Sequence, residues 1–310
     1  LKWKKLWWNN RKTMKLPKIT IKQLLEAGAH LGHKTFRWNP KMSKYIFGSK
    51  DSIHIIDLVQ TLEMINAALS EIYKCVSSGG KILFVSTKKQ AAEAIAILAK
   101  DTSQFYVNHR WLGGMLTNWK TISNSIKRYK KLSEDLKKEN TGFTKKELLK
   151  MGIQRDKLER SLGGISEMTK TPDMIFILDT NIEDLAVKES IKLNIPIVAI
   201  VDSNSNPTGI NYPIPGNDDA RRAINLYCEL IKQTILEAQK NISKEEKENK
   251  KDLNVKVEKK QKKEKEEEKL KTDKTKIKED AKKKQKPKAT KKPSKSIFAK
   301  VKDLATKKSK

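Results

Sequence analysis

Two short apolar runs with a helical pattern between them constrain the fold more than any other part of the chain. The runs Met174–Leu178 and Ile195–Val201 are rich in β-branched residues, too short for typical helices, and lack the alternation of a half-exposed strand. Between them, Thr180 and Glu183 have the spacing of a capping box, and Pro196 ends the helical pattern. The sequence therefore predicts a β-α-β unit with buried parallel strands. The apolar residues assigned to its helix are Leu185, Ala186, Ile191 and Leu193.

Similar patterns upstream extend this unit into a larger sheet. A helix capped by Asp57 stops near Ser77, before the buried strand Lys81–Thr87, and Thr87 with Gln90 is expected to cap the next helix. We therefore predict an α/β domain, a flavodoxin-like or Rossmann-like parallel sheet flanked by helices, over residues 14–115 and 171–240. The other elements predicted are a helix at 20–29 with a capping box of Thr20 and Gln23, a strand pair at Tyr45–Phe47 and Ile53–Ile56, a short strand at Phe105–Asn108 and a last helix beginning at Asn217.

Residues 116–170 interrupt the α/β pattern with two helical stripes. Apolar residues recur at helical spacing from Trp119 to Leu136 and from Leu158 to Met168, with a break at 140–142. We predict an inserted antiparallel helical hairpin, which would be a coiled coil. Thr144 and Glu147 are expected to cap its second helix. Its outer faces are crowded with cations, among them Lys120, Lys127 and Arg128.

Charge separates a basic fold from a basic tail. The chain has 67 Lys plus Arg against 37 Asp plus Glu, a net charge of +30. Residues 241–310 hold 28 of the lysines and 13 of the acids, so this segment carries about half of the net charge. Because it has too few apolar groups to offset its ordering entropy, we predict a Lys-rich disordered tail. The charge of both parts favours a polyanion as partner.

Other classes of protein find little support. No apolar run approaches the roughly 18 residues of a membrane span, so no membrane partner is predicted. Cys75 and Cys228 lie far apart within helical patterns and are interpreted as buried reduced thiols. Residues 1–13, ahead of Met14, are interpreted as an N-terminal extension or a wrongly assigned start that is not translated.

Two clusters combine cations with planar rings, the residue types that contact phosphates and unpaired bases. The first lies around Pro40, which ends any helix there, so we expect it on a loop; the alternative is a buried Trp38 with solvated cations. The second is followed by Gly113 and Gly114, and a buried Trp111 is an equal alternative there. The residues predicted to bind RNA in these clusters are His33, Lys34, Arg37, Trp38, Asn39, Lys41, Arg110 and Trp111. The hairpin cations Lys120, Lys127 and Arg128 are predicted to bind RNA as well.

Three separated stretches resemble the second protein of the small ribosomal subunit, the ribosomal S-two family of bacterial type. They are Leu24–Met42, His109–Trp119 and Pro172–Ala223, in the family's order. The resemblance implies an α/β domain with a coiled-coil projection and a structural, non-enzymatic role in translation. It also implies assembly on small-subunit rRNA beside neighbouring ribosomal proteins, including S-one in bacteria, within the cytoplasm. We expect no cofactor, no metal and no independent homo-oligomer.

A free α/β nucleotide-binding enzyme or regulator is the alternative function. Asp179 and Asp202 directly follow the two buried strands, where ligands bind in α/β sheets. The competing interpretation is that both carboxylates cap and turn the chain. No G-x-G-x-x-G is present, and Gly79-Gly80-Lys81 precedes a strand where a phosphate loop would follow one. His30 and His33 have a spacing that suits a metal, but no cysteine lies nearby.

Overall fold

The computed structural model describes residues 16–137 and 144–242, which all belong to one structural unit. The predictions for the extension at 1–13 and for the helix break at 140–142 lie outside the described residues. The same holds for the tail predicted at 241–310, apart from its first two residues.

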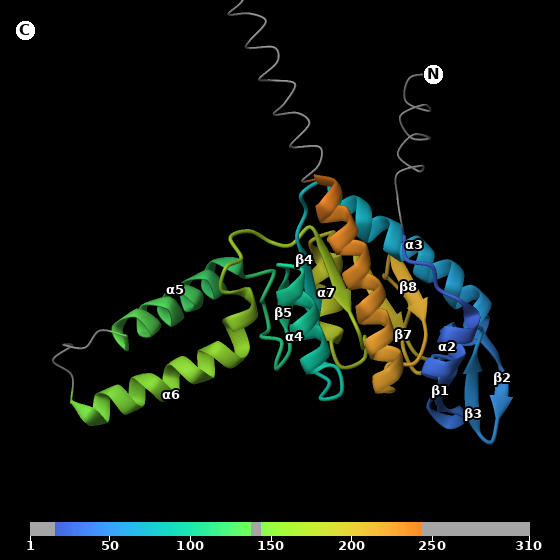
Figure 1. Ribbon diagram of the computed structural model, residues 1–310. Helices are drawn as coiled ribbons and strands as arrows, with labels where there is room; N and C mark the ends of the chain where they lie inside the picture. Colours follow the sequence, from blue (N-terminus) through green and yellow to red (C-terminus); the bar gives the residue numbers. More distant parts are fainter. Residues whose placement is uncertain (1–15, 138–143, 243–310) are drawn as a thin grey trace, which may run out of the picture. The chain divides into compact units, whose positions relative to one another are not determined.

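A sheet of five strands in the order β5-β4-β6-β7-β8 forms the centre of the fold, and all neighbouring pairs are parallel (Figure 1). Every residue of β4, β6 and β7 is buried, because both faces of the sheet are covered. This confirms the predicted Rossmann-like sheet and its buried strands. The strands are β4 (Ile82–Val85), β5 (Phe105–Val107), β6 (Met174–Ile177), β7 (Ile197–Val201) and β8 (Tyr212–Pro215).

The sequence does not predict β8, because it carries Pro213 and Pro215. A proline removes a backbone donor, and a strand tolerates that at the edge of a sheet. β8 occupies such a position, with a single neighbour, β7.

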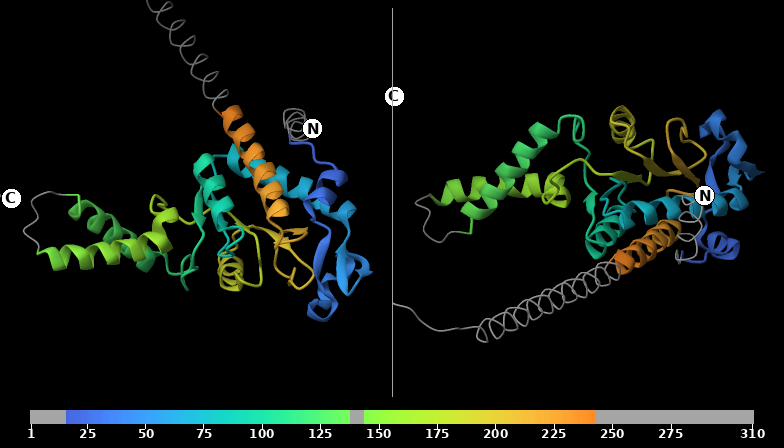
Figure 2. Two further views of the ribbon diagram at one scale, coloured as in Figure 1. Left: turned by 60° about the horizontal axis from the view of Figure 1, so that its bottom comes forward. Right: turned by 90° about the horizontal axis from the view of Figure 1, so that it is seen from above.

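Helices cover both faces of the sheet, as predicted. On one face, Phe84 and Phe176 pack in a core with α3, α4 and the C-terminal helix. On the other, Leu83 and Ile175 pack with α7 and the segment that precedes α5. Figure 2 shows α7 and the C-terminal helix on opposite sides of the sheet. The helices are α3 (Leu58–Ser77), α4 (Ala92–Asp101), α7 (Asp184–Lys192) and the C-terminal helix, described over residues 221–242.

Two of the predicted capping boxes are wrong, and they fail together. α7 has no side-chain cap and begins after Glu183, while α4 begins after Ala91 and is also without one. The Glu183 carboxylate instead accepts a hydrogen bond from the Thr87 backbone N–H, 2.7 Å away. Thr87 from one predicted box and Glu183 from the other therefore form a single hydrogen bond, which joins the segments that follow the neighbouring strands β4 and β6.

The buried face of α7 also differs from the prediction. Leu185 and Ile191 are 54% and 44% exposed, and Leu193 is exposed as well. Small and polar residues are buried in their place, since Glu189 of α7 accepts hydrogen bonds from the backbone of the segment that precedes α5. The buried residues of α7 are Ala186, Val187, Glu189 and Ser190.

A smaller antiparallel sheet, β1-β3-β2, precedes α3. The predicted pairing of β2 with β3 is confirmed, and Asp51 and Ser52 turn the hairpin with φ values of 51° and 58°. The sequence misses β1, where only a loop is expected. The elements of this region are α2 (Ile21–Ala27), β1 (Leu31–Lys34), η1 (Thr35–Arg37), η2 (Pro40–Tyr45), β2 (Ile46–Lys50) and β3 (Ile53–Ile56).

Two helices follow β5 and precede β6: α5 (Trp119–Asp135) and α6 (Lys145–Leu162), with η3 (Gly163–Ile165) after them (Figure 1). They contact each other, and Arg128 of α5 donates to the Gln154 side chain of α6 at 3.2 Å. The predicted capping box of Thr144 and Glu147 is confirmed, and so are the cap of α3 at Asp57 and the box of α2. None of the helices described is long and apolar enough to span a membrane.

Candidate nucleic-acid interface

The segment from β1 to η2 is held by the chain that follows β7. The backbone N–H of His33 donates to the Ser203 Oγ at 2.8 Å, and that of Asn39 donates to the Ser203 carbonyl at 2.8 Å. A Cβ on Gly32 would lie 2.9 Å from the Ser203 Oγ, so this position requires glycine for the close approach. The backbone of the segment is thereby fixed against the main sheet.

The side chains of this segment that carry charge point to solvent. Lys34, Arg37 and Lys41 are exposed, and none forms an ion pair within residues 16–137 and 144–242. The Asn39 Oδ1 accepts from the Lys41 backbone N–H at 3.0 Å, and the Lys41 Nζ donates to the Thr208 Oγ1 at 3.1 Å. Three positive charges therefore remain uncompensated on one short segment.

Two aromatic rings accompany these cations. Trp38 is 40% exposed, with its ring centroid 5.4 Å from that of His54, so it is neither fully buried nor free of support. Phe36, which sequence reasoning missed, is 73% exposed, and the Arg37 guanidinium lies 5.4 Å from its ring centre. We name Lys34, Phe36, Arg37, Trp38, Asn39 and Lys41 the N-terminal basic surface.

His33 does not belong to this surface. Its Nδ1 lies 2.9 Å from the Asp202 Oδ2 and its Nε2 lies 3.4 Å from the Asp219 Oδ2. The hydrogen bond with Asp202 raises the pKa of His33 above its ordinary value. Because both ring nitrogens face carboxylates, His33 ties β1 to the main sheet, and its RNA contact stays a prediction.

The carboxylates around His33 continue into a closed group of charges. The Lys88 Nζ lies 2.9 Å from Asp218, 2.5 Å from Asp219 and 3.3 Å from Asp179. Burial lowers the pKa of Lys88, but the hydrogen bonds with Asp218 and Asp219 raise it by more, so the net shift is above its ordinary value. Burial, with Asp179 and Asp202 nearby, raises the pKa of Asp218 to about 7. We name Lys88, His33, Asp179, Asp202, Asp218 and Asp219 the strand-end cluster.

The two predicted strand-end acids also shape the backbone. The Asp179 Oδ1 accepts from the backbone N–H groups of Asn181 and Ile182 at 2.8 and 3.3 Å. Asp202 accepts from the N–H of Ser203. These contacts agree with the interpretation of both residues as turn-forming.

The spacing of His30 and His33 does not produce a shared site. His33, Asp218 and Asp219 place ligand atoms within 4.8 Å of one another, but His30 is not part of this group. Lys88 already pairs with both aspartates. A cluster of acids that pairs with an internal lysine does not by itself define a metal site.

The second sequence cluster separates into an exposed and a buried residue. Arg110 is exposed, whereas Trp111 is 6% exposed and its Nε1 donates to the Glu189 Oε1 at 3.1 Å. The ring of Trp111 is therefore part of the core, the alternative that the sequence left open. The cations Lys120, Lys127 and Arg128 are exposed along α5.

Glu189 is the residue that sequence reasoning missed here. Besides Trp111, it accepts from the backbone N–H groups of Gly114, Leu116 and Thr117 at 2.8 to 3.1 Å. Burial opposes ionisation, but the hydrogen bonds from Thr117, Trp111 and Leu116 hold the pKa of Glu189 below its ordinary value. An acidic residue among the buried positions of α7 was the available signal.

Comparison with known proteins matches the sequence of this chain to one family. A family model described as "Ribosomal protein S2" matches residues 24–238. The chain is 58% identical over 224 residues to "Small ribosomal subunit protein uS2" of Sinorhizobium medicae, covering 72% of this chain and 88% of that protein. It is 55% identical over 240 residues to the protein of the same name from Rhizobium leguminosarum bv. trifolii, covering 77% and 93%. The protein of that name from Acidiphilium cryptum is 56% identical over 224 residues, covering 72% and 88%.

Proposed function

Since the chain belongs to the ribosomal protein S2 family, whose members are structural and not enzymatic, we propose that it is a constituent of the small ribosomal subunit that binds rRNA and neighbouring ribosomal proteins. The observation that carries this proposal is the N-terminal basic surface, where Lys34, Arg37 and Lys41 are exposed without acidic partners in the part of the chain described. Exposed cations beside Trp38 suit an irregular, partly unpaired RNA.

The proposed mechanism is positional. Lysine and arginine side chains neutralise phosphates and release counterions, while the half-exposed Trp38 and exposed Phe36 stack on unpaired bases. Arg110 and the cations of α5, Lys120, Lys127 and Arg128, widen the footprint. The backbone bonds to Ser203 hold the N-terminal basic surface in one orientation, so that RNA binding costs less ordering of the protein.

Finer assignments follow from the family and belong to the same proposal. We infer that the protein works in the cytoplasm on the small subunit, that residues 116–170 are an inserted coiled-coil arm, and that S-one is among its protein neighbours in a bacterium. The tail at 241–310 is proposed to contact RNA non-specifically through its lysines, in a manner that salt weakens. An α/β enzyme that uses the strand-end cluster is not favoured, because its carboxylates already pair with Lys88 and His33.

Co-sedimentation with small subunits tests the proposed function. The full chain is expressed in a bacterium and cell extract is separated on a sucrose gradient at physiological salt. We expect the protein in the small-subunit peak, and we expect Arg37→Ala, Lys41→Ala to shift part of it to the top of the gradient. A control with Lys22→Ala, Lys192→Ala loses the same charge from elsewhere on the surface and should stay with the subunit. A chain that remains entirely at the top of the gradient would refute the proposal.

A further inference from the structure

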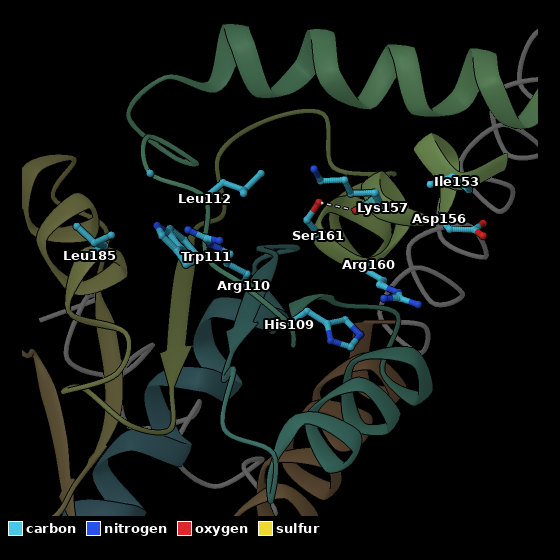
Figure 3. Close-up of a pocket in the computed structure, with 11 residues that line it drawn as sticks. His109, Arg110, Trp111, Leu112, Ile153, Asp156, Lys157, Arg160, Ser161 and Leu185 are labelled. Carbon is cyan, nitrogen blue, oxygen red and sulfur yellow. Dashed lines mark hydrogen bonds between the residues drawn. The ribbon is translucent and has the colours of Figure 1, made fainter. Parts of the chain in front are cut away.

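A cavity of about 740 Å³ opens where α6 meets the segment after β5 and the start of α7 (Figure 3). It is separate from the N-terminal basic surface. A cavity of this size is within the range of small-ligand sites, which is roughly 300 to 1,000 Å³. The residues of interest in its lining are Arg110, Leu112, Ile153, Lys157, Arg160 and Leu185. We name it the arm cavity.

Exposed aliphatic side chains line the arm cavity from two sides. Leu185, at the start of α7, is 54% exposed and Ile153 of α6 is 61% exposed, and Figure 3 shows them on opposite sides of the cavity, which Leu112 also lines. A Cβ built on Gly113, which also lines the cavity, meets no atom within 4 Å, so the adjoining backbone is open as well. Apolar side chains that converge on a cavity and remain exposed are typical of a binding site.

The rim of the cavity is positive. Arg110, Lys157 and Arg160 are exposed, and none of them forms an ion pair within the residues described. The one acid of the lining, Asp156, already pairs with Arg155 at 2.5 Å. An occupant is therefore expected to combine negative charge with a flat or apolar group.

A second, polar hollow of about 350 Å³ adjoins the arm cavity and shares His109, Asp156 and Arg160 with it. Asn108 and Glu159 also line this hollow. Their oxygens accept hydrogen bonds from hydroxyl and amino groups. The apolar side chains, the cations and these acceptors together match the base, phosphate and ribose of a nucleotide.

We propose that the arm cavity receives an unstacked base from a single-stranded or looped segment of RNA. The base lies against Leu112, Ile153 and Leu185, and the phosphates on either side lie against Arg110, Lys157 and Arg160. This inference rests on the proposed function and adds to it a preference for unpaired nucleotides, because the bases of a duplex are stacked and cannot enter the cavity. An acidic, apolar peptide is the competing occupant. RNA is favoured because it carries a negative charge at every nucleotide, which suits Arg110, Lys157 and Arg160, three cations without an ion pair in the described part of the chain.

Binding of labelled RNA to the full chain tests this proposal. Fluorescence anisotropy compares a single-stranded RNA of mixed sequence with an RNA duplex that has the same number of phosphates, at about 200 mM salt to weaken non-specific contacts. We expect tighter binding of the single strand. Leu185→Gln, Ile153→Gln should weaken single-strand binding about threefold to tenfold and leave duplex binding unchanged. Ile182→Gln, Leu149→Gln is the matched control, since both residues are equally exposed and lie outside the cavity.

The possible outcomes separate the cavity from the proposed function. Equal loss in the cavity variant and in the control, or no loss in either, would overturn the cavity proposal while co-sedimentation with the subunit still supports the proposed function. The same assay is run with a labelled Glu-Leu peptide. If the peptide binds the full chain, loses affinity in the cavity variant and is displaced by neither RNA, the cavity proposal is overturned in favour of a protein occupant. A selective loss of single-strand affinity in a variant that still enters small subunits would support it.

Discussion

Two neighbouring groups of charges, the N-terminal basic surface and the strand-end cluster, are both attached to residues 202 and 203 and differ in how their charges are paired. Lys88 of the strand-end cluster meets three carboxylates, and His33 meets two. The cations of the N-terminal basic surface meet no acid in the part of the chain described. Only the N-terminal basic surface therefore has unpaired charge to offer a partner, among the residues described.

The difference separates two roles for charged residues in this protein. Buried charges that satisfy one another hold segments of the chain together, and removing one leaves another unpaired inside the protein. Exposed charges without partners contribute little to folding and remain available for a polyanion. Substitutions in the strand-end cluster should therefore change stability, whereas substitutions in the N-terminal basic surface should change RNA binding.

The largest effect on stability is expected at Glu189, a buried carboxylate that is paired within the protein like those of the strand-end cluster. Glu189→Ala removes the acceptor of five hydrogen bonds and leaves the N–H groups of Gly114, Leu116 and Thr117 without it. We expect a loss of about 3–5 kcal/mol in the free energy of unfolding, measured by urea denaturation. Glu229→Ala, an exposed glutamate on the C-terminal helix, is the control and should lose less than about 0.5 kcal/mol. Equal stability of the two variants would contradict the role given to Glu189.

Lys88→Ala tests the strand-end cluster in the same way. The side chain of Lys88 is 11% exposed, and its loss leaves Asp179 and Asp218 close together without a cation. We expect the free energy of unfolding to fall by about 2–4 kcal/mol, with little change in RNA affinity at temperatures where the variant is folded. The adjacent exposed Lys89→Ala is the control. A stable Lys88→Ala variant that no longer binds RNA would reverse the comparison.

Trp38→Ala should have the opposite profile. The ring is 40% exposed, so its removal should cost little stability but weaken binding of single-stranded RNA by about 1–2 kcal/mol. Anisotropy with single-stranded RNA measures the affinity, and urea denaturation of the same sample measures the stability. Tyr129→Ala, half-buried on α5, controls for the loss of an aromatic ring. A large loss of stability with unchanged affinity would place Trp38 in the core.

The smallest effect expected is a pH dependence of stability from His33. Its folded pKa is raised above the ordinary value of 6.5, so its contribution is fully present below about pH 6.5 and is lost as the pH rises through the folded pKa. Asp218, with a pKa raised from 3.8 to about 7, acts in the same direction, since stability falls between these two values as the unfolded chain loses the proton first. Between about pH 6 and 8, the free energy of unfolding of the wild type should fall by about 1 kcal/mol more than that of His33→Gln. Parallel pH profiles for the two proteins would exclude this linkage.

The sequence predicts the architecture well because apolar runs report burial directly. β6 and β7 are recognisable since both of their faces are covered, and the caps at Thr20 and Thr144 are recognisable because their partners lie three residues away. The boxes at Thr87 and Thr180 fail because they lie at strand ends, where Glu183 reaches a neighbouring strand instead. Local spacing cannot show a partner that only the sheet brings close.

The same reasoning explains which site residues the sequence could identify. Exposed cations such as Arg37 and Lys41 are predictable from residue type alone. The burial of Trp111 and the pairing of His33 are not, because both depend on contacts with residues more than 70 positions away along the chain. The partners, Glu189 and Asp202, become neighbours of these residues only in the folded protein.

The central claim is that the unpaired cations of the N-terminal basic surface bind the RNA. The salt dependence of RNA binding tests this claim most directly. Affinity of the full chain for small-subunit rRNA is measured across a series of salt concentrations for the wild type, for Arg37→Ala, Lys41→Ala, and for the control Lys22→Ala, Lys192→Ala. We expect the first pair to weaken binding and to lower the slope of log affinity against log salt by about 1 to 2, because fewer counterions are released. The control should change neither quantity by as much. An affinity and a slope unchanged by the loss of Arg37 and Lys41 would contradict the account.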